Sequence, residues 1–361
     1  MKKKKISLFE PFVGKEEVEE ASRVIKGKFW ASGSGVGKVN EFENAFSKFV
    51  GCKDSVALNS GTAALHLALT VLNVEKTEVL VPSITFVSTA HTAVYNKAKP
   101  RFVDVDESTL CIDIEDLEKK ISRKTSVIIP VHMGGYPCDL EKIQKLAKDY
   151  KIKVVEDAAH ACGANYQGKK IGSHSDMVCF SFHPVKNLSM PTGGLIALNS
   201  NLNTINSLKS KRWCGISNRK DTSYDIDSLG WNFYMNEISA AIGLVQLKRL
   251  EKLNRRRVEI AKKYHKYLNL NKKMPFSEDC SYHLYWIRVK NRNEFMKKMT
   301  REGIETGIHY KPVHKMSYYK NKIKLDTSEK IQEEIVSLPM HPNLKDEQVE
   351  RIIHKVNSII N

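Results

Sequence analysis

A short apolar segment followed by an amphipathic one recurs along the first two-thirds of this 361-residue chain. The apolar segments are rich in β-branched residues and almost uninterrupted, which is typical of strands buried on both faces. Between several of them, apolar residues recur at helical spacing, as Leu65, Leu69 and Leu72 do. The alternation predicts an α/β fold with a mainly parallel sheet covered by helices. The predicted strands are Ser55–Leu58, Glu78–Val81, Arg101–Val105, Ser126–Val131, Lys153–Glu156, Met177–Phe182 and Leu195–Leu198.

The pattern changes near Asn236, where long amphipathic segments replace the short apolar ones. We expect a large domain over residues 1–250 and a smaller α+β domain over residues 251–361, each of ordinary domain size. The elements predicted after the change are helices over residues 237–253 and 255–270, a strand over 282–289, and helices around 292–302 and 345–360.

Composition narrows the class of protein. A chain with 41% hydrophobic and 27% charged residues fits a globular protein. It contains no apolar run of about 18 residues that would predict a membrane-spanning helix, and its basic start, Met1–Phe9, lacks the apolar stretch of a signal peptide. We therefore expect a cytoplasmic protein. Seven cysteines without a Cys-x-x-Cys pair predict reduced thiols and no metal site.

The formal net charge of +17 allows a nucleic-acid binder or an enzyme for anionic substrates. The basic residues are scattered, and no aromatic residues are interleaved with them in the pattern of a nucleic-acid recognition module. A phosphate-bearing substrate therefore fits the charge better than a nucleic acid does.

Two of the predicted strands each deliver one polar residue where they end. Asp157 follows Val154-Val155-Glu156, and Lys186 follows Ser181–Val185. Ligands of open α/β sheets bind at the carboxyl ends of strands. An amine and a carboxylate at that edge suit a pyridine cofactor that carries an aldehyde. The amine forms a Schiff base, and the acid keeps the ring nitrogen protonated so that the ring withdraws electrons. Taken singly, an acid at a strand end is more often a helix cap or an ion-pair partner, and a lysine is more often a solvated side chain.

Other polar and aromatic residues follow other predicted strands. Asn59–Ala64 begins a helix, and its free N–H groups, with Gly61 and the hydroxyl of Thr62, suit a phosphate. The same residues also make a common helix N-cap. Ser181 is a second candidate phosphate ligand. Phe86 is placed to lie flat on a heteroaromatic ring, although an aromatic residue there is also typical of a core.

Two further candidates lie close to these motifs. His160, three residues after Asp157, is placed to reach a ring hydroxyl of the cofactor, although a lone histidine is more often structural. Asn232, between two aromatic residues, is either a turn residue or a ligand contact across a subunit boundary. Each signal is weak alone, and their order along the chain makes them stronger together.

In this order, the motifs resemble those of the DegT/StrS sugar aminotransferases, which have the fold type I architecture of aspartate aminotransferase and use pyridoxal phosphate. The likeness extends nearly from end to end of the chain. It implies a mostly parallel seven-stranded sheet between helices and a smaller C-terminal α+β domain. The segments that carry it are Ser34–Gly37, Glu41–Glu43, Asn59–Leu65, Pro100–Asp106, Glu156–Ala161, Ser181–Lys186, Asn236–Leu244, His309–His314 and Ser337–Pro339.

The resemblance implies four contacts with the ring of pyridoxal phosphate. Lys186 would bind the cofactor covalently and later move a proton between cofactor and substrate carbons. Asp157 would pair with the pyridine nitrogen, His160 would contact the ring oxygen, and Phe86 would stack on the ring. Lys186, Asp157 and His160 are the predicted catalytic residues.

The resemblance also implies a phosphate site and a substrate segment. Gly61, Thr62 and Ser181 would bind the cofactor phosphate, and Asn232 would complete the site from the partner subunit of a homodimer. Three residues match a segment near the substrate cleft: His309, Tyr310 and His314.

The chain departs from the family pattern at two points. Relatives usually have Thr-Gly-Glu-Gly-Gly after the lysine, where this chain has Met190-Pro191-Thr192-Gly193-Gly194. Tyr234 replaces a commoner arginine, which removes one cation that could meet an anionic group.

The resemblance implies that glutamate donates an amino group through the cofactor to a keto sugar linked to UDP, dTDP or GDP, for surface-polysaccharide or glycoconjugate biosynthesis. His160 favours a 4-keto-6-deoxy sugar. The alternatives are a free ketose or keto-carbocycle, a 3-keto sugar nucleotide, a dehydratase, and a non-catalytic relative that binds nucleic acid. Lys186 argues against the dehydratase, because those relatives replace this lysine, usually with histidine. The complete set of site residues argues against the non-catalytic relative.

Overall fold

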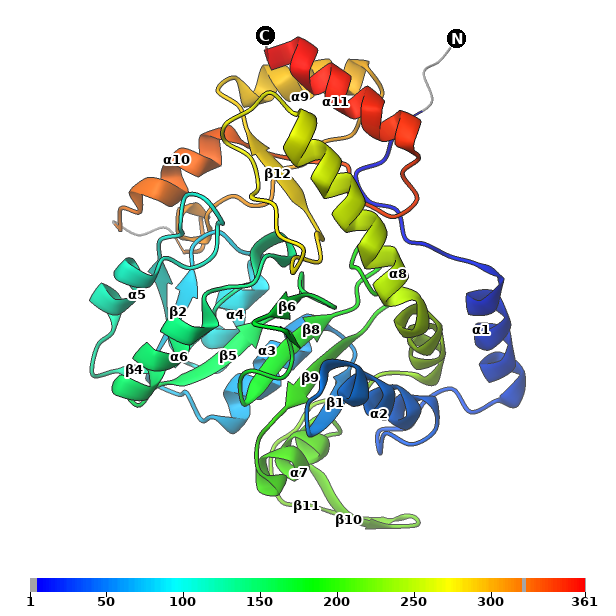
Figure 1. The fold of residues 1–361 in the computed structure, drawn as a ribbon. Helices are drawn as coiled ribbons and strands as arrows, with labels where there is room; N and C mark the ends of the chain where they lie inside the picture. The colour runs from blue at the N-terminus through cyan, green and yellow to red at the C-terminus, as the bar shows by residue number, and fades with distance from the viewer. Residues whose placement is uncertain (1–4, 320–322, 361) are drawn as a thin grey trace.

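The computed structural model describes residues 5–319 and 323–360, whose helices and strands are shown in Figure 1. In chain order they are α1 Lys15–Gly27, α2 Lys38–Val50, β1 Asp54–Leu58, α3 Gly61–Val71, β2 Glu78–Pro82, α4 Ser88–Tyr95, β3 Lys99–Val103, α5 Ile114–Lys120, β4 Thr125–Ile128, η1 Met133–Gly135, α6 Leu140–Asp149, β5 Lys153–Asp157, β6 Asn165–Tyr166, β7 Lys169–Lys170, β8 Met177–Ser181, β9 Gly194–Leu198, α7 Leu202–Lys211, β10 Ile216–Lys220, β11 Ser223–Ile226, α8 Glu237–Tyr267, β12 Tyr285–Arg288, α9 Arg292–Arg301, η2 Val313–Lys315, α10 Asp326–Glu334, β13 Ile335–Leu338 and α11 Asp346–Ile360.

The centre of the fold is a seven-stranded sheet with the order β1-β9-β8-β5-β4-β2-β3. Strand β9 is antiparallel to both of its neighbours, β1 and β8, and the remaining pairs are parallel. All seven strands were predicted from the sequence, and the prediction of a mostly parallel seven-stranded sheet is confirmed. Strands β5 and β8 lie side by side, with Asp157 opposite Cys179. Their carboxyl ends therefore meet at the same edge of the sheet.

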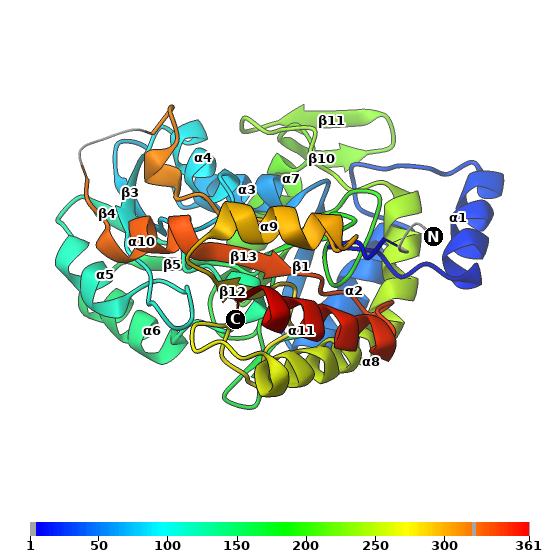
Figure 2. The same ribbon diagram turned by 90° about the horizontal axis from the view of Figure 1, so that it is seen from above.

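Helices cover both faces of the sheet, as Figure 2 shows: α3, α4 and α7 on one face, and α2, α5 and α6 on the other. Successive strand residues alternate between the two faces, because side chains of a strand point to opposite sides. In β2, Val79 and Val81 pack under α3 and α4, whereas Leu80 packs on the opposite face. Both faces are buried, which explains why the strands are apolar without interruption.

A smaller unit follows the sheet in the chain. Strands β12 and β13 pair antiparallel, with Tyr285 opposite Leu338, and α9, α10 and α11 pack nearby. The unit also includes an N-terminal residue, because Ile6 forms a parallel bridge with Ile304. The α+β character of this unit agrees with the prediction.

Helix α8 corrects one prediction. We expected two helices, over residues 237–253 and 255–270, and the structure has one continuous helix of 31 residues. Two residues of the polar stretch at the expected break, Asn254 and Arg257, are buried with hydrogen-bond partners instead. The Asn254 side chain donates to the Cys162 carbonyl at 2.9 Å, and Arg257 donates to the Met340 carbonyl at 2.7 Å. The proposed domain boundary at residue 250 therefore falls inside one helix, and the division into two domains remains a prediction.

Strand β4 ends at Ile128, three residues before the predicted end. Pro130 has no N–H to donate to a ladder, but the pairing with β5 continues irregularly. The Asp157 N–H donates to the Pro130 carbonyl at 2.9 Å, and Val131 bridges Asp157. Among the described residues, none of the helices has the length and apolar character needed to cross a membrane.

Candidate active site

A cavity of about 450 Å³ opens where β5 and β8 end. Nine of the eleven predicted site residues line it, although they come from five separate segments of the chain. The nine are Gly61, Thr62, Phe86, Asp157, His160, Ser181, Lys186, His309 and Tyr310.

Asp157 is the last residue of β5 and is 6% exposed. Thr89 Oγ1 donates a hydrogen bond to its Oδ2 at 2.8 Å, and the Ala159 N–H donates to its Oδ1 at 3.1 Å. Burial raises the pKa of the Asp157 carboxyl, and the two hydrogen bonds and the nearby Lys186 partly offset this rise. The site thus contains a buried acid whose charged form would gain from a cationic partner in the cavity.

Lys186 follows β8 in a turn closed by its own N–H, which donates to the His183 carbonyl at 2.8 Å. Burial lowers the pKa of its amine to about 8, and Asp157 acts in the opposite direction. A larger share of the amine is therefore neutral at physiological pH than for a solvated lysine, and the neutral form is the nucleophile.

The start of α3 forms an anion site beside Lys186. Ser60 caps the helix by accepting a hydrogen bond from the Ala63 N–H at 3.1 Å, whereas the N–H groups of Gly61 and Thr62 belong to the first turn, which has no intrahelical acceptors. A side chain at Gly61 would clash, because its Cβ would lie 2.7 Å from Ser181 Cβ. The missing side chain lets the Ser181 hydroxyl and the helix start face the same space.

The loop that departs from the family pattern touches this anion site. Thr192 Oγ1 donates to the Asn59 carbonyl at 2.6 Å, and both Thr192 and Gly193 line the cavity. A Cβ on Gly194 would lie 2.2 Å from the Ser60 carbonyl group. The altered loop therefore keeps a direct connection to the segment that would hold a phosphate.

His160 has a defined tautomer in this environment. The Gly134 N–H donates to its Nδ1 at 3.3 Å, so its proton lies on Nε2, which is 3.1 Å from the Tyr310 hydroxyl. Burial lowers the pKa of His160 well below its usual value, and the positive charge of Lys186 adds to the effect. A neutral imidazole thus directs an N–H donor toward the cavity. Phe86, which is 55% exposed, lines the cavity near Tyr310.

Two predicted site residues are not among those that line this cavity. His314 is completely buried between Ser83, whose hydroxyl is 2.5 Å from Nδ1, and Glu329, which is 3.3 Å from Nε2. This placement gives no support to a direct contact with substrate. Asn232 is exposed, and its backbone bridges Trp213 on the surface of the same subunit. An exposed side chain is consistent with a contact to a partner subunit, which stays a prediction.

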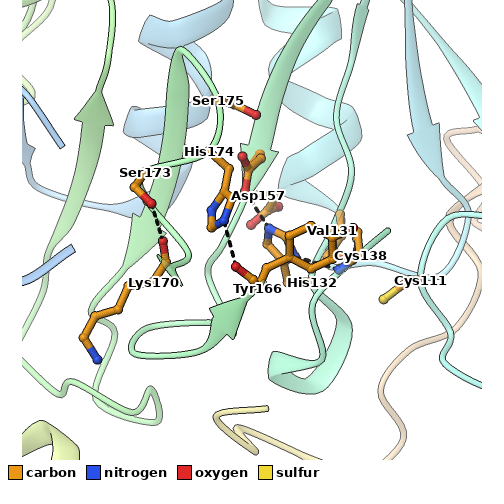
Figure 3. A network of polar contacts seen from close by, with 12 residues as sticks. Cys111, Val131, His132, Cys138, Asp157, Tyr166, Lys170, Ser173, His174 and Ser175 are labelled. Carbon is orange, nitrogen blue, oxygen red and sulfur yellow. Dashed lines mark hydrogen bonds and ion pairs between the residues drawn. The ribbon is translucent and has the colours of Figure 1, made fainter. Parts of the chain in front are cut away.

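A buried polar network supports the end of β5 (Figure 3). Glu156 and His132, both fully buried, are joined by a 2.9 Å contact between Oε2 and Nε2. The Cys138 N–H donates to the other ring nitrogen of His132 at 3.0 Å, which places the His132 proton on Nε2. The pair links the segment after β4 to β5. The side chain of Glu156 points to the opposite face of the strand from that of Asp157, so the pair holds the end of β5, and with it Asp157, in place.

Sequence reasoning missed Thr89, Phe9 and His283. Thr89 holds Asp157, Phe9 lines the cavity, and His283 Nε2 lies 3.5 Å from Lys186 Nζ. Phe9 and His283 are far from the strand ends in sequence, and neither belongs to a recognisable motif. The only available signal was a histidine at the second position of the predicted strand over residues 282–289.

Residues 11–357 match the DegT/DnrJ/EryC1/StrS aminotransferase family. The chain belongs to this family. The spore coat polysaccharide biosynthesis protein SpsC of Bacillus subtilis is 33% identical, over 97% of this chain and 96% of that protein.

Solved structures agree with this assignment. The putative sugar aminotransferase Spr1654 from Streptococcus pneumoniae is 29% identical, with a TM-score of 0.93 over 99% of this chain and 98% of that one. PseC of Helicobacter pylori, an aminotransferase involved in the biosynthesis of pseudoaminic acid, is 28% identical, with a TM-score of 0.93 over 99% of both chains. The predicted family, fold and enzyme class are confirmed. Spr1654 has been solved in apo, PLP and PMP forms, in agreement with pyridoxal phosphate as the cofactor of this DegT/StrS aminotransferase.

The residues of the cavity fit pyridoxal phosphate. The α3 start and Ser181 suit its phosphate, Asp157 suits its ring nitrogen, and Lys186 supplies the amine for its aldehyde. Among the described residues that line the cavity, Lys186 is the only lysine or arginine. Further positive charge for anionic ligands must therefore come from the helix start or from outside this cavity.

Proposed function

We propose that this aminotransferase moves an amino group from glutamate to a keto sugar attached to a nucleoside diphosphate. The observation that carries the proposal is the convergence of Lys186, Asp157 and the α3 start on one cavity. A cavity of about 450 Å³ lies within the range typical of small-molecule and cofactor sites. The nucleotide would extend through the open side of the cavity.

Pyridoxal phosphate supplies an aldehyde for the amine of Lys186 and a ring that accepts electrons from the substrate. The chain's own residues do the remaining work. Lys186 moves the proton between donor and acceptor atoms, which its lowered pKa of about 8 permits near neutral pH. Asp157, fixed by Thr89, would pair with the ring nitrogen and keep it positively charged. His160, whose Nε2 lies 3.1 Å from the Tyr310 hydroxyl, would contact the ring oxygen.

The biosynthetic processes named for two relatives support a sugar substrate. SpsC takes part in spore coat polysaccharide biosynthesis and PseC in pseudoaminic acid biosynthesis. We infer for this chain a 4-keto-6-deoxy sugar, on the basis of His160, and a product used in a surface polysaccharide or glycoconjugate. The reaction would take place in the cytoplasm, where sugar nucleotides are made. His309 and Tyr310, on the cavity wall, are the proposed substrate contacts.

Amination of a 4-keto-6-deoxy sugar linked to UDP or dTDP is expected to exceed that of the same sugar without the nucleotide. We expect at least about a 100-fold difference in kcat/KM, because binding energy from the nucleotide can lower the barrier at the remote carbonyl. The measurement is amino-sugar formation by mass spectrometry, with glutamate as donor and 2-oxoglutarate as the second product. Equal rates on the free sugar would support the free-ketose alternative, and exclusive turnover of a 3-keto nucleotide would reassign the aminated carbon.

Asn232→Ala is expected to weaken retention of the cofactor about 10-fold or more, since a hydrogen bond to a charged phosphate contributes roughly 1.5–3 kcal/mol. Retention is measured by the visible absorbance, near ~410–430 nm for a protonated Schiff base, that remains after dialysis. The matched control is Asn293→Ala, at an exposed asparagine of α9 outside this cavity.

Hybrid dimers test whether the contact crosses the subunit boundary. In a homodimer with shared sites, a Lys186→Met subunit paired with an Asn232→Ala subunit restores one site with both native residues. Mixing the two inactive or weakened variants should therefore recover activity. Failure to recover activity in isolated hybrid dimers would place Asn232 and Lys186 of one site on the same subunit, or remove Asn232 from the site.

A further inference from the structure

Four aromatic rings form a column beside Lys186. Phe9 stacks on His283 with 5.5 Å between ring centroids and an interplanar angle of 14°, and His283 lies 4.4 Å from His160. His160 in turn stacks on Tyr310 at 6.0 Å and 19°. The rings come from four distant segments of the chain, so the column joins the N-terminal segment and the smaller unit to the end of β5.

Of the four rings in this column, His283 is the one in hydrogen-bonding contact with the Lys186 amine. Its Nε2 is 3.5 Å from Lys186 Nζ, a long hydrogen bond, and the ring is 1% exposed. Its Nδ1 has no hydrogen-bond partner among the described residues. While Lys186 is an ammonium group it can only donate, so Nε2 is then the acceptor, and the proton of the ring lies on Nδ1.

We propose that His283 is a positioning residue, which accepts a hydrogen bond from the amine of Lys186 whenever that amine is free and keeps it inside the cavity. The proposal rests on the proposed role of Lys186 as the reacting amine. Because the stacked neighbours Phe9 and His160 fix the ring of His283, the acceptor stays in one place while the flexible lysine side chain moves.

The charged and titratable groups around this contact support an acceptor role. Lys186 faces Asp157, His160, His183 and His309, and His283 also faces Arg257. Burial, with the positive charge of Lys186, lowers the pKa of His283 well below its usual value. The imidazole is therefore neutral at the pH where Lys186 is cationic, and its lone pair is available to the ammonium group.

The ionisation of Lys186 in the full-length apoenzyme tests the contact. Trace acetylation at several pH values, followed by peptide mass mapping, gives the pKa of the Lys186 amine, for which about 8 is expected in the native protein. His283→Phe keeps a flat ring between Phe9 and His160 but removes the acceptor. We expect the pKa to fall by about one unit, because the ammonium form loses a hydrogen bond. His283→Gln, which retains an acceptor, should restore most of the shift.

In the holoenzyme, His283→Phe should lower kcat more than it changes KM, and the basic limb of the pH–rate profile should differ from that of the native enzyme. An unchanged Lys186 pKa in folded His283→Phe apoenzyme would overturn the proposal. If that variant does not fold, nitrogen NMR of the native apoenzyme decides, since a proton on Nε2 of His283 is incompatible with an acceptor role. These readouts do not require Lys186 to react with the cofactor, so failure of the proposed function would be recognised separately, by borohydride mapping.

Discussion

Lys186→Met is expected to abolish amino transfer, with a loss in kcat of at least about 10⁴-fold. The variant removes both the nucleophile that binds the cofactor aldehyde and the base that moves the proton, and the loss of such a group reaches this size in other enzymes. Methionine fills a similar volume without the amine. Activity is measured as 2-oxoglutarate formed from glutamate, and residual activity near the native level would remove Lys186 from the reaction.

Borohydride reduction of the native holoenzyme locates the covalent link independently of turnover. The reduced cofactor should be found on the peptide that contains Lys186 and should be absent from Lys186→Met. Lys153→Met is the matched control, because Lys153 is an exposed lysine at the opposite end of β5. Label on any other lysine of the native enzyme would refute the assignment.

Unfolding does not account for the expected loss, because an ammonium group that is partly removed from water opposes folding. The pKa of Lys186 is lowered to about 8 in the folded protein, against about 10.4 in an unfolded chain. The resulting penalty on stability is present in full below the folded pKa and disappears as the pH rises toward the unfolded pKa. At pH 7 the Lys186→Met apoenzyme should therefore be at least as stable as the native apoenzyme in a thermal melt, and any difference should diminish by pH 10.

The strands and the strand-end residues were predictable because local sequence determines both. Uninterrupted apolar runs mark strands buried on two faces, and the order of strands along the chain places Asp157 and Lys186 after their ends. A parallel sheet then brings the carboxyl ends of neighbouring strands together. The part of the cavity formed by the strand ends required no further long-range information than this, apart from the family resemblance.

The contacts that tertiary packing creates were not predictable in this way. His283 reaches Lys186 across 97 residues, and Phe9 reaches the cavity because the N-terminal segment pairs with the smaller unit at Ile304. No local pattern encodes either approach. His314 illustrates the opposite case. Its motif placed it near the substrate, whereas the packing of Ser83 and Glu329 around it uses both ring nitrogens.

The wrong prediction of two helices in place of the continuous α8 has the same cause. A run of polar and basic residues normally marks a solvent-exposed segment or the end of a buried one. Here the polar side chain of Asn254 accepts from Asn187 and donates to the Cys162 carbonyl, so burying it leaves those groups paired. Sequence periodicity does not reveal hydrogen-bond partners that come from another part of the chain.

Asp157→Asn is expected to lower kcat by about 10³-fold while the borohydride label on Lys186 persists, since the loss of one ionised group that assists proton transfer is worth about 10²–10⁴-fold. Asparagine has the same shape: its Oδ1 can accept from the Ala159 N–H, and its Nδ2 can donate to the Thr89 hydroxyl. It cannot carry the negative charge that keeps the ring nitrogen protonated, so the ring withdraws electrons less well. The pH midpoint of the visible absorbance band should also move.

Asp176→Asn provides the control, because Asp176 is an exposed carboxylate just before β8, at the far end of the strand next to β5. It should leave both kcat and the absorbance midpoint unchanged. If Asp157→Asn also leaves them unchanged, the acid at the end of β5 does not act on the cofactor. Its burial with Thr89 would then serve the packing of α4 against the sheet. If instead kcat falls and the label is lost, Asp157 is required to retain the cofactor in the site. The two measurements together therefore separate an electronic role of this carboxylate from a purely structural one.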